Sequence, residues 1–253
     1  MADRDQIVSF LNELLDIGAY PDGMPVGMQV PGTAQVRHVA TGVSASLELF
    51  QRAAQDGADM LIVHHGLFFG SGPRPPLSEQ DRDRLKTLFD HDITLAGYHL
   101  ALDAHPQVGN NAIICDRLGV AGREPFGAHG PHTLGFVGAL DRPLSIAQMV
   151  ERVEQQIGPG PLVLGRGPEG IERVAVISGG ASGYVAAAAA AGAQCFITGE
   201  PNEQAKWAAD EAGIHCIAAG HYATEVFGVQ ALGALVAERF SVEHGFIDIP
   251  NPV

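Results

Sequence analysis

Three short stretches of the sequence combine histidine and carboxylate residues at spacings that suit metal binding. His64 and His65 are adjacent and follow the apolar run LIV. The pairs His99–Asp103 and His221–Glu225 each span four residues, which places an imidazole and a carboxylate on one face of a helical turn. One such pair can simply cap a helix. Two equivalent pairs together with a histidine dipeptide indicate a shared metal site.

The predicted site offers neutral imidazoles and carboxylates but no thiolate. Its five expected ligands are His64, His65, Asp103, His221 and Glu225. Such donors suit Zn, Mn, Fe, Co or Ni. Five ligands are too many for one catalytic zinc ion with three protein ligands. They suit two divalent metal ions per chain, about 3.5–4 Å apart and bridged by a carboxylate and a water. His99 is either a sixth ligand or a group that orients Asp103.

The surroundings of these residues suggest how they would be presented. Successive side chains of a strand point to opposite faces, so we expect the strand to end at Val63 and the two histidines to lie on a turn, one per metal. Glu200, in TGEPNEQ, and His99 are the candidate catalytic proton carriers. The alternative for Glu200 is a favourable position at a helix N-terminus. The glycine-rich segment 178–183 lacks the lysine of a P-loop and predicts a strand-to-helix turn.

The elements that would position the site occur twice in the chain. A strand-helix-strand segment from Val39 recurs from Val174 at an offset of 135, so that LIVHH matches FITGE. Residues 92–103 match 214–225 at an offset of 122, and the extra residues of the first copy fall in the loop after Phe69. We therefore predict an α/β fold of two similar, intertwined α/β/α lobes that arose by internal duplication.

The predicted lobes divide the metal ligands between them. Residues 1–125 form the first repeat, which carries His64, His65 and Asp103. Residues 126–253 form the second, which carries His221 and Glu225. Both His-x-x-x-carboxylate pairs follow short apolar strands, so the site would lie at the carboxyl ends of the strands, where α/β proteins bind ligands.

Composition narrows the class of protein. The 253 residues carry 15 Lys and Arg against 29 Asp and Glu, a formal net charge of −14, which makes nucleic acid an unlikely partner. The three cysteines, each in an apolar context, predict buried core residues rather than disulfides or a thiolate zinc site. An amphipathic, charged N-terminal segment without a signal region and the lack of long apolar runs predict a cytoplasmic protein that does not bind membranes.

Several motifs resemble a known family along essentially the whole chain. They are GMQV (27–30), VHHGLFF (63–69), HLALD (99–103), FITGEPNEQ (196–204), AAGHYATE (218–225) and FIDIPNP (246–252). They resemble the Nif-three-like dinuclear metal-centre family, labelled "GTP cyclohydrolase 1 type 2 homologue", and most of all its YbgI-type members. One departure is the leucine after His99, where the family more often has threonine; it concerns the local hydrogen bonding of His99. The long domain that some relatives insert at the seam between the lobes does not occur.

The resemblance implies the same five metal ligands, two intertwined lobes, and a toroidal homohexamer whose metal sites face an internal cavity. The family label implies a metal-dependent hydrolase that acts on a small-molecule substrate, a nucleotide or related heterocycle, through a metal-bridging hydroxide. The alternative function is non-catalytic. A metal-binding hexamer could store, deliver or sense metal, or act as an interaction scaffold.

Overall fold

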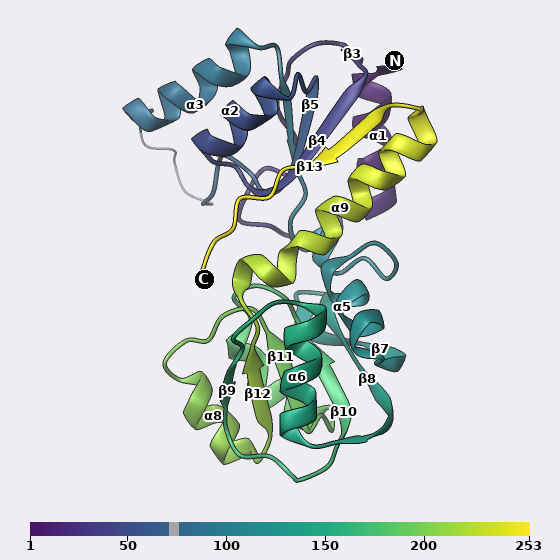
Figure 1. Ribbon diagram of the computed structural model, residues 1–253, viewed down its shortest axis with the longest axis vertical. Coiled ribbons are helices and arrows are strands. Elements are labelled where there is room, and N and C mark those ends of the chain that lie inside the picture. The colour runs from purple at the N-terminus through teal and green to yellow at the C-terminus, as the bar shows by residue number, and fades with distance from the viewer. Residues whose placement is uncertain (71–75) are drawn as a thin grey trace. The chain divides into compact units, whose positions relative to one another are not determined.

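The computed structural model describes residues 1–70 and 76–253 of a mixed α/β protein with two main sheets (Figure 1). The chain forms two compact units. Unit 1 comprises residues 1–102 and 228–249, and unit 2 comprises residues 103–227 and 250–253. Each unit has its own sheet and its own apolar core, so each is described by itself.

Unit 1 is built around a five-stranded sheet in the order β13-β4-β5-β6-β2. Its strands are β13 (Glu243–Phe246), β4 (His38–Ser44), β5 (Met60–His65), β6 (Thr94–Gly97) and β2 (Gly27–Val30). The first four are parallel, and β2 runs antiparallel along β6. A small antiparallel pair, β1 (Ala2–Asp3) and β3 (Gln35–Val36), precedes β4 in the chain.

Helices flank the sheet of unit 1 (Figure 1). They are α1 (Arg4–Leu15), α2 (Leu47–Gln55), α3 (Glu79–Asp90) and the part of α9 (His221–Phe240) that follows Phe227. Leu61 and Val63 of β5 are fully buried in one apolar cluster with Phe50 of α2 and Leu88 of α3. Side chains alternate along a strand, so β5 contributes every second residue to this cluster.

Polar caps begin the helices of unit 1 where the sequence offers a short oxygen-bearing side chain. Ser46 accepts a hydrogen bond from the amide of Leu49 at the start of α2. Ser78 and Asp81 form a capping box at the start of α3. Such caps satisfy amides that have no partner within the helix and typically contribute about 1 kcal/mol each.

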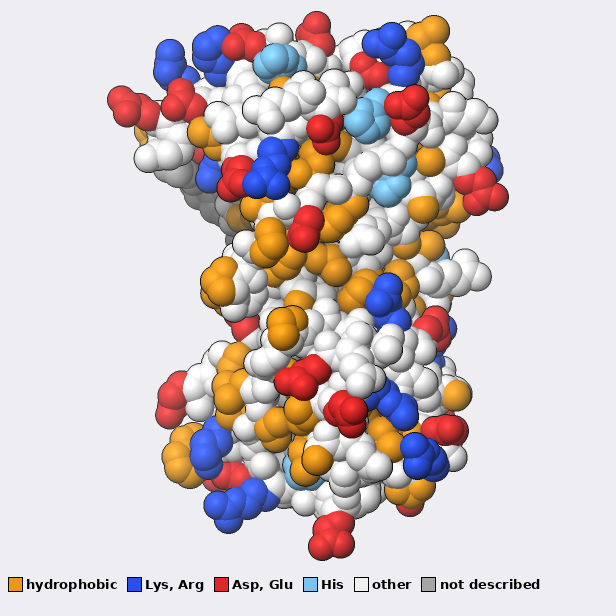
Figure 2. All heavy atoms as spheres, viewed as in Figure 1, with side chains coloured by type: hydrophobic (Ala, Val, Ile, Leu, Met, Phe, Trp, Pro, Cys, Tyr) orange, Lys and Arg blue, Asp and Glu red, His pale blue; other side chains and the backbone are white. Residues whose placement is uncertain are grey.

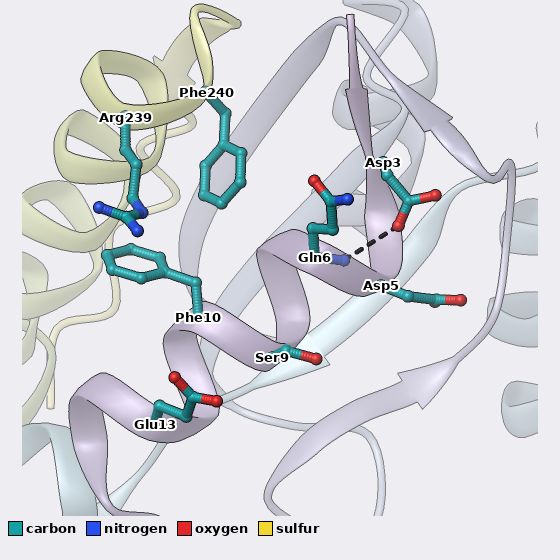
Figure 3. A pocket seen from close by; sticks show the side chains of 8 residues that line it. All are labelled: Asp3, Asp5, Gln6, Ser9, Phe10, Glu13, Arg239 and Phe240. Carbon is teal, nitrogen blue, oxygen red and sulfur yellow. Dashed lines mark hydrogen bonds between the residues drawn. The ribbon is translucent and has the colours of Figure 1, made fainter.

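A pocket of about 440 Å³ lies where α1 approaches the end of α9 (Figure 3). The Arg239 guanidinium lies 4.5 Å from the centre of the Phe10 ring, and the Phe10 and Phe240 rings meet edge to face with centres 5.7 Å apart. Asp3, which caps the start of α1 by accepting a hydrogen bond from the Gln6 amide, also lines this pocket. The residues that line this pocket include none of the predicted ligands.

Unit 2 is built around a six-stranded sheet in the order β7-β8-β10-β11-β12-β9. Its strands are β7 (Ala121–His129), β8 (His132–Leu144), β10 (Ile171–Val176), β11 (Cys195–Thr198), β12 (His215–Ala218) and β9 (Leu162–Leu164). The three strands β10, β11 and β12 are parallel, and the other three pair antiparallel with their neighbours.

Unit 2 contains the first residues of α9 and several short helices. They are α5 (Asn110–Leu118), α6 (Ile146–Gln156), the 3₁₀ turn η1 (Ser182–Tyr184), α7 (Val185–Ala190) and α8 (Ala205–Ala212). Ile114 and Leu118 of α5 are fully buried with Met149 of α6 and Ile197 of β11. The remaining short helix, α4 (Leu100–Asp103), ends where unit 2 begins.

The α/β class that the sequence predicts is confirmed, and both sheets contain three parallel strands at their centre. Val39 pairs with Met60 and Val174 with Cys195, which is the predicted offset of 135 at both positions. The common origin of the two repeats stays a prediction. Part of the predicted insertion in the first copy, residues 71–75, lies outside the described residues.

The compact units differ from the predicted halves 1–125 and 126–253. Unit 2 begins at Asp103, and the chain returns to unit 1 at Gly228. The reason is packing: α5 buries its apolar face in the core of unit 2, and β7 pairs with β8 in the sheet of unit 2. Asp103 therefore belongs to unit 2, whereas the sequence placed it in the first repeat.

Acidic and basic side chains are interspersed on the face shown in Figure 2. Among the described residues, no helix is both long and apolar enough to cross a membrane. The three cysteines are buried and unpaired with one another, as predicted. Burial raises the pKa of Cys115 and of Cys216 to about 12, which keeps these thiols protonated at neutral pH.

Candidate metal centre

Three histidines of unit 1 form one cluster at the end of the sheet. His64 and His65 end β5, and His99 lies two residues after β6. Their ring centres are 4.8 Å apart for His64 and His65, 5.0 Å for His64 and His99, and 5.4 Å for His65 and His99. One nitrogen of each ring lies within 4.8 Å of the others, so the cluster could hold a metal ion.

Protein groups hold the Nδ1 atoms of the two adjacent histidines. His64 Nδ1 lies 2.9 Å from the carbonyl oxygen of Tyr98. A carbonyl only accepts, so this nitrogen donates its proton and Nε2 of the neutral ring carries the lone pair. His65 Nδ1 lies 3.0 Å from the Ser44 hydroxyl. Metal-binding histidines are commonly held in this way, with the second ring nitrogen hydrogen-bonded to the protein.

His99 is held by a carboxylate that the sequence analysis did not identify. Its Nδ1 donates to Oδ1 of Asp22 over 2.9 Å. Asp22 also accepts hydrogen bonds from the amides of Leu100 (3.1 Å) and Met24 (3.2 Å). Burial raises the pKa of the Asp22 carboxyl, but the hydrogen bonds and the charge of His99 outweigh this, and the net pKa lies below its ordinary value.

The expectation that the strand ends at Val63 is wrong. β5 continues through His65, because Ser44 of β4 pairs with His65 and the amide of Ala45 donates to the His65 carbonyl over 2.8 Å. The neighbouring β6 ends opposite Val63, at Gly97. The two histidines therefore lie at the end of β5, beyond the last residue of the neighbouring strand β6, rather than on a turn.

In unit 2, Asp103 is a buried carboxylate held by two donors. It ends α4 and is 5% exposed. The Asn110 side-chain amide and the Ser178 hydroxyl both donate to Oδ1, over 2.8 and 3.0 Å. Two donors on one oxygen fix the plane of the carboxylate.

The pair His221 and Glu225 lies at the start of α9, as predicted. His221 Nε2 lies 3.2 Å from Glu225 Oε2, and His221 Nδ1 lies 3.5 Å from Glu200 Oε2. The hydrogen bond with Glu225 raises the pKa of His221 against the lowering by burial, and the charges of Glu225 and Glu200 raise it further. Glu225 is almost fully buried, whereas the Glu200 side chain is 40% exposed.

The glycine-rich segment after β10 lies against these carboxylates. Ser178 contacts Asp103, and the next residue, Gly179, has a positive φ of 61°. A Cβ at Gly179 would lie 2.3 Å from Glu225 Oε1 and 3.2 Å from His221 Nε2. Only a residue without a side chain leaves that space, so glycine at this turn allows His221 and Glu225 to lie close to it.

The sequence pointed to His64, His65 and His99 of the unit 1 cluster and to Asp103, His221, Glu225 and Glu200 of unit 2; their roles as ligands or proton carriers stay predictions. It missed Asp22, because Pro-Asp-Gly is an ordinary turn signal. It interpreted segment 178–183 correctly as a strand-to-helix turn, since η1 and α7 follow β10, but did not place it at the site. The available signal was its glycine pair, Gly179 and Gly180, which follows the apolar strand β10 after two residues.

The residues present fit divalent metal ions. Unit 1 offers imidazoles whose Nδ1 atoms are engaged by the protein, and unit 2 offers an imidazole and two buried carboxylates. Nitrogen and oxygen donors with ordered hydrogen-bond partners are typical of Zn, Mn, Fe, Co or Ni sites. The number and identity of the ions stay a prediction.

Comparison with known proteins places the chain in a family. The sequence model of Duf34/NIF3 (NGG1p interacting factor 3) matches residues 2–252. The chain belongs to the Duf34/NIF3 family. Curated members similar to it include proteins named "GTP cyclohydrolase 1 type 2 homolog" from Deinococcus radiodurans and Escherichia coli K12. Both are 42% identical to the chain; the alignments cover 98% of this chain and 94% and 98% of those proteins.

Solved structures that are similar to the chain have the same fold. Protein ybgI, described as of unknown function, superposes with a TM-score of 0.93 at 40% identity over the full length of both chains. TTHA1606 from Thermus thermophilus gives 0.91 at 36% identity, also over both full lengths. Reduced HcgD from Methanocaldococcus jannaschii gives 0.84 at 23% identity over 98% of each chain, which shows the fold alone.

Proposed function

We propose that this Duf34/NIF3 protein is a metal-dependent hydrolase with two divalent metal ions per chain. The proposed ligands are His64, His65, Asp103, His221 and Glu225. The observation that carries the proposal is the way these side chains are held. Two imidazoles of unit 1 have Nδ1 engaged by protein groups, and the carboxylates of unit 2 are buried against hydrogen-bond donors and a glycine turn.

Two divalent ions, when bound, would polarise a substrate oxygen and lower the pKa of a water molecule into the neutral range. The chain's own contribution is orientation. Tyr98 and Ser44 hold the rings of His64 and His65 so that each directs Nε2 away from the group that anchors it. Asn110 and Ser178 hold the plane of Asp103. Ligands fixed in this way lose little freedom when a metal binds.

Proton transfer at the proposed site is assigned to His99 and Glu200. His99 belongs to the histidine cluster of unit 1 and is backed by the Asp22 carboxylate. Glu200 lies beside Nδ1 of His221 and is 40% exposed, so it is open to solvent as a proton carrier must be. A well-placed acid or base of this kind typically contributes a factor of roughly 10²–10⁴ to the rate.

The substrate class is taken from the relatives. Proteins 42% identical over almost the whole chain are named GTP cyclohydrolase 1 type 2 homologs. We therefore propose a nucleotide or related heterocycle as substrate, with hydrolysis of a carbon–nitrogen or phosphoryl bond as the reaction.

The test is turnover by protein reconstituted separately with Zn, Mn, Fe, Co or Ni, across a panel of nucleotides that includes GTP. His64→Ala removes a ligand, and His91→Ala, at the exposed C-terminal end of α3, is the matched control. We expect turnover in wild type and His91→Ala and its loss in His64→Ala. Turnover that persists in His64→Ala contradicts metal catalysis. Bound metal without turnover under any metal instead supports the non-catalytic function in metal storage, delivery, sensing or scaffolding.

We also propose that the chain assembles as a homohexamer, on the strength of its family membership. Light scattering of the purified protein measures the assembly directly. A mass six times that of the chain supports the proposal, and a monomer or dimer at all concentrations contradicts it.

A further inference from the structure

Asp22 makes more contacts than a turn residue needs. It lies in the loop between α1 and β2, and its side chain is only 3% exposed. Oδ1 accepts from His99 Nδ1 (2.9 Å) and the Met24 amide (3.2 Å), and Oδ2 accepts from the Leu100 amide (3.1 Å). A buried carboxylate is costly unless such donors satisfy it. The loop therefore brings a negative charge to His99 from 77 residues away.

The contacts of Asp22 fix both the backbone and the ring of His99. The bond to the Leu100 amide holds the first residue of α4, directly after His99. The bond to Nδ1 fixes the ring itself, and since a carboxylate only accepts, Nδ1 carries the proton. The lone pair of the neutral ring is then on Nε2, and one nitrogen of this ring lies within 4.8 Å of nitrogens of His64 and His65.

The partner of His99 differs in charge from those of its neighbours. His64 donates to a carbonyl and His65 contacts a hydroxyl, both neutral groups. A hydrogen bond to a carboxylate is roughly twice as strong as one between neutral groups, so Asp22 holds the orientation of the His99 ring more firmly than the neutral partners hold those of its neighbours.

We propose that Asp22 is a positioning residue that holds the ring of His99 in the Nδ1–H form, so that Nε2 carries the lone pair. The expected effect on turnover rests on the proposed function. The tautomer itself does not depend on any activity. Asp22 acts through His99, whose ring and following backbone it holds.

The experiment uses Zn-loaded protein labelled with ¹⁵N-histidine. Long-range ¹H–¹⁵N spectra report which ring nitrogen of His99 carries the proton, and His99→Gln assigns the signals. We expect the Nδ1–H form in wild type. In Asp22→Asn the charge is lost and the Nε2–H form becomes populated. Wild-type protein in the Nε2–H form, or an Asp22→Asn spectrum unchanged at His99, would overturn the proposal. The wild-type spectrum decides even if the variant fails to fold.

Asp59→Asn is the matched control. Asp59 precedes β5 in the same unit and likewise accepts backbone amides, those of Arg37 (2.7 Å) and His38 (3.2 Å), with a side chain 15% exposed. We expect Asp22→Asn to lower kcat for GTP by roughly 10²–10⁴-fold, with metal content and KM nearly unchanged. We expect Asp59→Asn to lower stability but leave kcat and the His99 spectrum as in wild type.

The outcomes separate this proposal from the function on which it rests. Equal loss of kcat in both variants, or loss of metal from Asp22→Asn in step with activity, contradicts a positioning role through His99. If wild type turns over none of the nucleotides under any metal, the proposed function fails. The His99 spectrum still decides whether Asp22 sets the tautomer.

Discussion

Replacement of Gly179 by alanine should weaken metal binding far more than it weakens the fold. The backbone of Gly179 is held in place: its amide donates to the Thr224 hydroxyl, and its carbonyl accepts from the amides of Gly199 and Glu200. The new methyl group would lie 2.3 Å from Glu225 Oε1. Because the backbone is fixed, the carboxylate must move.

The size of the displacement follows from van der Waals contact. A carbon and an oxygen need roughly 3.4 Å, so Glu225 Oε1 must retreat by about 1 Å. Metal–ligand distances tolerate only about 0.2 Å. Disturbing even the groups that support a ligand lowers affinity by roughly 10–100-fold, and we expect at least this for Gly179→Ala. That range corresponds to about 1.4–2.7 kcal/mol of binding free energy.

Gly213→Ala separates this effect from backbone strain. Gly213 also has a positive φ, 67° against 61°, but an added Cβ there meets no atom within 4 Å. A left-handed conformation costs alanine about 1–2 kcal/mol at either position. Both variants should therefore lose similar unfolding free energy through the backbone, and only Gly179→Ala should lose metal affinity.

The assay is competition with a chelator of known zinc affinity, alongside thermal unfolding of the metal-free proteins. Wild-type affinity in Gly179→Ala would refute the assignment of Glu225 as a ligand. Equal losses of affinity in the two variants would show that strain in unit 2, rather than the displaced carboxylate, controls metal binding.

Two further predictions concern buried groups. Burial raises the pKa values of Cys115 and Cys216 to about 12, so these thiols should react with a thiol reagent at neutral pH only as fast as the protein unfolds. The labelling rate with and without denaturant measures this. Rapid labelling of the native protein would contradict their burial. The pKa of Asp22 is depressed in the folded state, so its contribution to stability is present above its ordinary pKa of 3.8 and is lost as the pH falls toward the folded value. The difference in unfolding free energy between wild type and Asp22→Asn should be constant near neutral pH and shrink in acid; a difference that grows on acidification would reverse the sign of the argument.

The residue types and spacings of the site were predictable because they follow local rules. A His-x-x-x-Glu pair shares a helix face wherever the helix forms, and α9 does begin at His221. The apolar runs of β4 and β5 likewise predicted a buried parallel sheet. These features depend on neighbours within a few residues along the chain.

Features set by distant partners were not predictable in the same way. The strand continues through His65 because β4, some 20 residues earlier, supplies hydrogen bonds that outweigh the preference to separate two rings. Asp22 reaches His99 across 77 residues, and nothing in Pro-Asp-Gly distinguishes it from an ordinary turn. The boundary at Asp103 depends on which sheet α5 packs against.

The metal content of the intact protein tests the central claim most directly. Elemental analysis, with anomalous scattering to locate the ions, should find close to two transition-metal ions per chain, bound by His64, His65, Asp103, His221 and Glu225. The content should fall sharply in Glu225→Ala. At most one ion per chain in the intact protein, or an undiminished content in Glu225→Ala, would contradict the dinuclear site.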